Sequence, residues 1–127
     1  MKYLLDTDVI INHIRGKKAI DKKVISEGST ISIISYGELL YGACKSKNKE
    51  KSLNLISSFL NDLSIKIINL DEKIMREYAE VKTLLEKMGN RLDEFDLLIG
   101  TTAKLNSLTL LSGNNRHYQR IPGLKVV

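Results

Sequence analysis

Cysteine, histidine and long apolar runs are all scarce in this sequence of 127 residues. The only cysteine is Cys44, which excludes an intrachain disulfide and a cluster of thiolate metal ligands. No apolar run approaches the ~20 residues of a membrane span, and the amino terminus lacks the basic start and cleavage site of a signal peptide. We therefore expect a cytoplasmic protein that is not held by disulfides or embedded in a membrane.

The scarcity of histidine disfavours acid–base chemistry without a metal, because such chemistry most often uses histidines as acid and base. Only two are present. His13 falls beside Ile10 and Ile14 on a predicted helix, so we expect a packed histidine. His117 falls in a polar loop, where a surface position without a catalytic role is expected.

What remains is ordinary globular composition, with 43% hydrophobic and 28% charged residues. The length, together with the absence of repeats and linkers, predicts one domain over residues 1–127. The net charge of +5 favours contact with a polyanion, although it does not define a function. Two basic groups, Lys17–Lys23 and Lys45–Lys51, are expected on solvated faces that could also follow the phosphates of a polyanion.

Short apolar segments alternate with segments of helical period, which predicts an α/β fold. The sheet should be mostly parallel, with four to five strands and helices on both faces. The predicted strands are Tyr3–Leu5, Ser29–Ile34, Ile65–Leu70, Leu108–Leu111 and Leu124–Val127. The predicted helices are Thr7–Arg15, Lys17–Glu27, Ser35–Cys44, Lys51–Leu63, 72–88 and Phe95–Leu105. Ser112–Arg120 has no clear period and reads as a polar loop.

Four polar residues fall just after a strand or in the first turn of a helix. They are Asp6, Glu38, Asp96 and Asn114. Because right-handed crossovers bring the carboxyl ends of parallel strands to one edge, we expect these side chains to lie near one another.

Each of these residues also has a purely structural explanation. Asp6 or Asp8 could cap the first helix, and Asp93 could cap the helix that contains Asp96. Ser35 and Glu38 fit a capping box. The asparagine pair at 114–115 could simply form a turn.

A metal would explain all the carboxylates together. Three ionised carboxylates repel one another unless a proton or a cation lies between them. Asp96 opens a helix dominated by Leu97, Leu98 and Ile99, so its carboxylate needs a partner there. With no histidine or cysteine among the candidates, oxygen ligands favour a hard cation such as Mg²⁺ or Mn²⁺.

A different enzyme class also fits the first motif. Asp6-Thr7-Asp8-Val9 after an apolar strand is similar to the start of haloacid-dehalogenase-like phosphatases, with Asp6 as nucleophile and Asp8 as acid/base. That interpretation leaves Glu38 and Asp96 without a function, and the lysine and second acidic pair of that superfamily are missing.

Four stretches, taken in order, resemble the PIN-domain ribonucleases and, within them, the VapC-type toxins of toxin–antitoxin pairs. These stretches are LLDTDVII, SYGELLYGA, DEFDLLIGTTA and LTLLSGNNRHYQRIPGL, and the resemblance covers essentially the whole chain.

The resemblance implies a Mg²⁺-dependent endoribonuclease, with Mn²⁺ as a substitute, whose products carry 5′-phosphate and 3′-hydroxyl ends. It carries over catalytic roles to Asp6, Glu38, Asp96 and Asn114, with the first three as metal ligands. One departure is that Asn114 stands where the family commonly has aspartate, which leaves open a catalytically inactive module that binds RNA or a protein. Gly100 stands where alanine is more common, and we expect it to affect packing only.

The resemblance also implies partners: an RNA substrate, a VapB-like antitoxin whose carboxyl-terminal segment blocks the acidic cleft, and a second copy in a homodimer. The sequence offers a physical reason for a partner, because the helices Ser35–Cys44 and Lys51–Leu63 carry more apolar residues than one side of a small sheet needs. Tyr41 falls away from the buried face and is predicted to be exposed beside Glu38.

Overall fold

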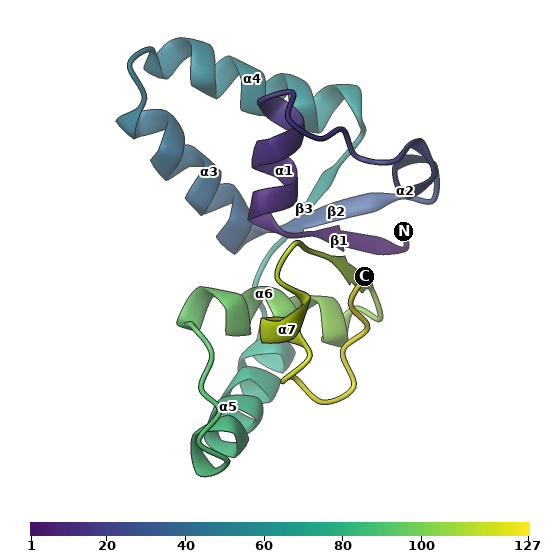
Figure 1. The fold of residues 1–127 in the computed structure, drawn as a ribbon, viewed down its shortest axis with the longest axis vertical. Coiled ribbons are helices and arrows are strands. Elements are labelled where there is room, and N and C mark those ends of the chain that lie inside the picture. Colours follow the sequence, from purple (N-terminus) through teal and green to yellow (C-terminus); the bar gives the residue numbers. More distant parts are fainter.

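The computed structural model describes all 127 residues of the chain and has a four-stranded parallel sheet at its centre. The strand order is β3-β2-β1-β4 (Figure 1). The strands are β1 (Tyr3–Leu5), β2 (Ser29–Ser32), β3 (Lys66–Ile68) and β4 (Thr109–Leu111). β1 is central, paired in parallel with β2 and β4. All strands therefore end at the same edge, as predicted.

Helices cover both faces of this sheet, which confirms the predicted architecture (Figure 1). One face carries α1 (Thr7–Ile14), α2 (Lys22–Ser26), α3 (Ile33–Lys45) and α4 (Lys49–Asp62). The other carries α5 (Glu72–Lys87), α6 (Glu94–Leu105) and α7 (Asn115–Tyr118). None of these helices combines the length and the apolar character needed to cross a bilayer.

The alternation of side chains along β1 divides the core in two. Leu4 packs with residues of α5, α6 and α7, whereas the next residue, Leu5, packs with residues of α1 to α4. Both side chains are fully buried. A strand that is buried on both faces carries consecutive apolar residues. This is why Tyr3–Leu5 is a continuous apolar run and does not alternate between apolar and polar residues.

The boundary between β2 and α3 differs from the prediction. The sequence predicts a strand over Ser29–Ile34 and a helix from Ser35, but β2 ends at Ser32 and α3 starts directly after it. Ser32 Oγ accepts a hydrogen bond from Ile34 N at 3.0 Å, so Ser32 is the N-cap. The predicted capping box of Ser35 and Glu38 is therefore wrong, because both residues lie inside the helix. The strand propensity of isoleucine is outweighed here by the cap.

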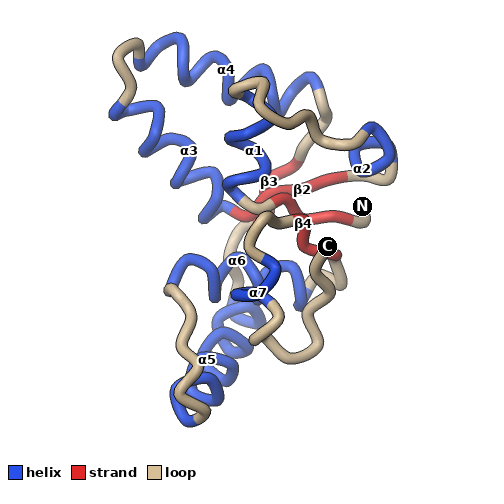
Figure 2. Tube along the Cα trace, viewed as in Figure 1, coloured by secondary structure: helices blue, strands red, loops and turns tan.

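The predicted helix Lys17–Glu27 is wrong in its first half. α2 comprises only the second half, where Asp21 Oδ1 accepts a hydrogen bond from Lys23 N at 2.9 Å and caps the helix. The preceding residues form the loop between α1 and α2 (Figure 2). His13 Nδ1 accepts a hydrogen bond from Ile20 N at 3.0 Å, which fixes this loop in a non-helical path. His13 is thus a packed histidine, as predicted.

The end of the chain also differs from the prediction. The predicted fifth strand, Leu124–Val127, is reduced to one parallel bridge between Leu110 and Val126. The predicted polar loop Ser112–Arg120 contains α7, whose Tyr118 is fully buried. A helix of four residues is too short to produce a detectable period in the sequence.

The predicted start of the two helices on the opposite face is confirmed. Asp71 Oδ1 accepts from Ile74 N at 2.8 Å and caps α5, and Asp93 Oδ2 accepts from Phe95 N at 3.2 Å and caps α6. α6 is buried from Leu97 to Ala103, as its apolar sequence predicts. These caps fix where α6 begins and therefore where its first-turn carboxylate lies.

Candidate active site

Two of the four predicted site residues, Asp6 and Asp96, meet at the carboxyl edge of the sheet. Asp6 directly follows β1, and Asp96 lies in the first turn of α6. The hydroxyl oxygen of Tyr118 lies 3.1 Å from Asp6 Oδ1 and 3.2 Å from Asp96 Oδ1. Both carboxylates therefore contact a single phenolic oxygen.

Asp6 is 5% exposed and is held by three donors. Thr7 N donates to Oδ1 at 2.8 Å, which makes Asp6 the N-cap of α1, as its structural explanation predicts. Ser112 Oγ donates to Oδ2 at 2.8 Å, and the Tyr118 hydroxyl donates to Oδ1. Asp6 therefore caps a helix and also presents a fixed carboxylate to the edge of the sheet.

Burial, and after it the nearby charge of Asp8, raise the pKa of the Asp6 carboxyl to about 6, against the hydrogen bonds from Ser112, Thr7 and Tyr118, which lower it. Burial also raises the pKa of Asp96, opposed by the hydrogen bond from Tyr118. Burial is the largest cause for both carboxyl groups, and neither forms a salt bridge with a basic side chain.

Glu38 lies beside this pair and is linked to it through Thr7. The Thr7 hydroxyl donates to Glu38 Oε1 at 2.6 Å, and its oxygen lies 3.0 Å from Ser35 Oγ. Thr7 directly follows Asp6 in the sequence. The side chain of Thr7 therefore lies between Glu38 and the buried carboxylate of Asp6.

Asn114 lies near the pair through its backbone. Its N donates to Ser112 Oγ at 2.9 Å, and the Ser112 hydroxyl donates to Asp6. The Asn114 side chain is exposed and makes no capping hydrogen bond at the start of α7. The structure therefore brings the loop of Asn114 to the site without giving its amide a partner in the chain.

A fourth carboxylate, Asp8, lies at the same edge and is not among the residues predicted for a metal site. A Cβ on Gly113 would lie 2.7 Å from Asp8 Oδ2, so this carboxylate occupies the space that a side chain at 113 would fill. The charge of Asp8 raises the pKa of both Asp6 and Asp96. The local negative charge is therefore larger than the three predicted acids supply.

The acidic side chains fit a divalent metal by chemistry, although no three of them converge tightly enough to enclose an ion. Asp6 and Asp96 are together, and Glu38 is displaced towards Thr7. Carboxylate oxygens are the ligands that hard divalent cations prefer. A buried group of like charges with raised pKa values is an environment in which a cation binds favourably.

Sequence reasoning missed Tyr118, because it lies in a segment without periodicity. The only signal was an aromatic residue three positions before Ile121 in an otherwise polar stretch, and both side chains are buried. His117 is exposed on the same short helix, and its charge acts to lower the pKa of Asp96, so it lies near the site.

Comparison with known proteins gives consistent results at the level of family and fold. The family model described as "PIN domain" matches residues 3–124. Ribonuclease VapC2 of Rickettsia felis is 34% identical, with 98% of this chain and 95% of that protein covered. The tRNA(fMet)-specific endonuclease VapC of Shigella flexneri is 28% identical, with 98% and 96% covered. The crystal structure of VapBC2 from Rickettsia felis bound to a promoter DNA fragment is similar with a TM-score of 0.90 and 30% identity, covering 100% of this chain and 98% of that one.

Proposed function

This chain belongs to the PIN-domain family, and on that premise we propose that it is an endoribonuclease and the toxin of a toxin–antitoxin pair. Similar proteins along the whole chain are ribonucleases and endonucleases by name. The family assignment removes the alternative of a haloacid-dehalogenase-like phosphatase, in which Asp6 and Asp8 would be nucleophile and acid/base. Because its proposed substrate is RNA, the expected site of action is the cytoplasm.

One observation carries this proposal: the buried carboxylate of Asp6 and the half-buried carboxylate of Asp96 meet at the carboxyl edge of the parallel sheet. Ligands of open α/β sheets bind at this edge. A structural pair of carboxylates would be expected to have a basic partner, yet no salt bridge in the chain involves either residue.

PIN-domain nucleases of the VapC type depend on a divalent metal, and we propose Mg²⁺ for this chain, with Mn²⁺ as a substitute. Asp6 and Asp96 would hold the ion, and Glu38 would complete the set of acidic ligands. When bound, such an ion lowers the pKa of a coordinated water and stabilises charge on the phosphate.

The chain's own residues prepare this site before RNA binds. Thr7 N and Ser112 Oγ fix the plane of the Asp6 carboxylate. The Thr7 hydroxyl holds Glu38 at the rim of the site. The exposed amide of Asn114 would hold a water or a phosphate oxygen. By the family resemblance the products would carry 5′-phosphate and 3′-hydroxyl ends.

Basic side chains near the acidic site are proposed to contact the RNA backbone. Lys18 lines a cavity of about 560 Å³ that also contains Asp8 and Ser112, so it lies next to the acidic edge. Lys45 is the last residue of α3, the helix that carries Glu38, and its Nζ lies 4.9 Å from the ring centroid of Tyr41 on the same helix. Such contacts add affinity that falls as salt rises, without reading sequence.

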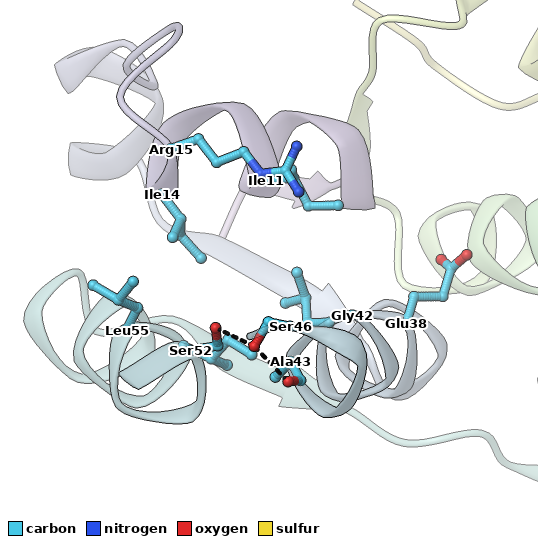
Figure 3. Close-up of a pocket in the computed structure, with 11 residues that line it drawn as sticks. Ile11, Ile14, Arg15, Glu38, Gly42, Ala43, Ser46, Ser52 and Leu55 are labelled. Atoms are coloured by element: carbon cyan, nitrogen blue, oxygen red, sulfur yellow. Dashed lines mark hydrogen bonds between the residues drawn. The ribbon is translucent and has the colours of Figure 1, made fainter. Parts of the chain in front are cut away.

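The antitoxin is proposed to bind the groove between α1, α3 and α4. This groove has a cavity of about 200 Å³ and an apolar lining, with Arg15 and Glu38 among its polar residues (Figure 3). Leu55 on its α4 side is 45% exposed, and Tyr41 on the neighbouring surface of α3 is 65% exposed, as predicted. Because Glu38 lies at this groove, an apolar segment bound there could place an arginine at the carboxylates.

A homodimer is also part of the proposed assembly.

Expression of this chain alone is expected to arrest growth, and co-expression of the product of the neighbouring reading frame is expected to restore it. RNA from arrested cells should carry new 5′ ends at defined sites, found by sequencing RNA ends. The purified chain should cut the same RNA only when a divalent metal is present. Unimpaired growth, with RNA bound but not cut, would instead favour the inactive binding module.

Replacing Asn114 by Asp is expected to tighten metal binding. The loop of Asn114 lies next to Asp6, so a carboxylate there adds negative charge that a cation neutralises. The Mg²⁺ concentration for half-maximal cleavage should fall several-fold. Asn115→Asp, at the first residue of α7, is the matched control. An unchanged requirement in Asn114→Asp would show that position 114 lies outside the metal's surroundings.

A further inference from the structure

Tyr118 has a buried ring and a hydroxyl that is shared between two acids. The residue is 0% exposed, and its ring belongs to the core formed with α5 and α6. Its hydroxyl lies 3.1 Å from Asp6 Oδ1 and 3.2 Å from Asp96 Oδ1. A phenol has one proton to donate, so the same hydroxyl serves both carboxylates in turn. Burial and the two nearby charges raise the pKa of Tyr118, so the hydroxyl keeps its proton.

The two acids depend on this hydroxyl to different extents. Asp6 has two further donors, Thr7 N and Ser112 Oγ, at 2.8 Å each. The carboxylate of Asp96 has no hydrogen-bond partner in the chain other than Tyr118. Its Oδ2 is thus left without a partner in the chain, while its Oδ1 is held. The position of Asp96 relative to Asp6 therefore depends on Tyr118.

The ring of Tyr118 reaches this place because Gly100 has no side chain. A Cβ on Gly100 would lie 3.3 Å from Tyr118 Cδ1 and would collide with Ile121 Cδ1. Gly100 is fully enclosed in the buried stretch of α6. The glycine therefore lets α7 pack closely on α6, and this close packing brings the phenol between the two carboxylates.

We propose that Tyr118 is the positioning residue of the acidic pair: its hydroxyl holds Asp6 and Asp96 at the separation at which they bind a divalent metal. This inference rests on the proposed function of the site. Partners that orient metal ligands in this way contribute roughly 10–100-fold to metal affinity. Gly100 contributes to this arrangement by letting the Tyr118 ring pack against α6. The sequence alone predicts an effect of Gly100 on packing only.

The test is the affinity of the purified chain for Mn²⁺ in the absence of RNA. This affinity is measured by titration calorimetry or from the electron paramagnetic resonance signal of free Mn²⁺. Tyr118→Phe keeps the ring and removes the hydroxyl, and its Mn²⁺ affinity should fall about tenfold. Tyr78→Phe makes the same chemical change on α5, where the Tyr78 hydroxyl accepts only from Lys82 Nζ, and it should bind Mn²⁺ like the wild type.

Cleavage assays separate positioning from a general structural effect. In Tyr118→Phe the metal concentration for half-maximal cleavage should rise about tenfold, while kcat at saturating metal stays within a few-fold of wild type. Gly100→Ala keeps the hydroxyl and displaces the ring, so it should also weaken Mn²⁺ binding. Adding Tyr118→Phe to Gly100→Ala should then cause little further loss, because the hydroxyl is already out of place.

Unchanged or tighter Mn²⁺ binding in Tyr118→Phe would overturn the inference. If that variant fails to fold, as judged by circular dichroism, Gly100→Ala decides: wild-type Mn²⁺ affinity in that variant overturns the inference equally. A wild-type chain that binds no divalent metal and cuts no RNA would instead contradict the proposed function itself. The two failures are therefore distinguishable.

Discussion

Asp6→Asn is expected to lower the rate of RNA cleavage by roughly 100-fold or more, because it removes the charge of the best-held metal ligand. Asp6 alone combines full burial of its position with three hydrogen-bond donors. The measurement is the single-turnover rate of RNA cleavage at saturating Mg²⁺. Asp62→Asn, an exposed aspartate at the end of α4, makes the same chemical change away from the site and should leave the rate unchanged. A normal rate in Asp6→Asn would contradict the assignment of the site.

The same variant is expected to be more stable than the wild type when no metal is present. The pKa of Asp6 is raised to about 6, so at pH 7 its ionised form costs the folded state about 2–3 kcal/mol. An asparagine removes that cost but fits the donors Thr7 N and Ser112 Oγ less well, so a net gain of about 1 kcal/mol is expected. Thermal unfolding in a metal chelator measures this gain. A less stable variant would contradict the electrostatic account while leaving the catalytic one intact.

Metal binding is expected to weaken steeply below pH 6. The ligands bind an ion only when deprotonated, and the pKa of Asp6 is about 6. Between pH 6 and pH 5 the Mn²⁺ affinity should fall by about fivefold for one competing proton with a pKa of about 6, and more if Asp96, whose pKa is also raised, competes as well. Calorimetric titrations between pH 5 and pH 7.5 measure this dependence. Equal affinity across the range would show that neither carboxylate binds the ion.

The stability of the metal-free protein should change with pH in the opposite sense. Between pH 4 and pH 6 the folded state keeps a proton on Asp6 that the unfolded state has lost, because the folded pKa is the higher one. Stability from this group is therefore present below pH 4 and is lost as pH rises through 6. The difference in unfolding free energy between Asp6→Asn and wild type isolates the pH-dependent contribution of Asp6. It should grow from pH 4 to pH 6 and then level off.

Local patterns in the sequence determined most of the fold and the placement of Asp6 and Asp96 at the same edge of the sheet. The apolar segment Tyr3–Leu5, the caps at Asp71 and Asp93 and the period of the long helices depend on interactions within a few residues. A parallel sheet brings strand ends to one edge by chirality alone. The meeting of Asp6 with Asp96 could therefore be predicted without coordinates.

Local patterns were insufficient where a cap or a loop contact decided the outcome. At the start of α3, isoleucines with strand propensity are helical because Ser32 caps the helix before them. Between α1 and α2, a contact from His13 to the backbone of Ile20 holds the loop. Propensity is a weak preference, and a single hydrogen bond of this kind outweighs it.

Only the tertiary structure decided how the carboxylates are held. Ser112 and Tyr118 reach Asp6 across 106 and 112 residues of chain, and no local signal encodes such contacts. They arise because β4 pairs with β1 and because Gly100 lets α7 pack against α6. The residue types that could bind a metal can be identified from the sequence alone. Their spacing, burial and raised pKa values depend on packing between distant segments, which brings like charges together at a partly buried edge of the sheet.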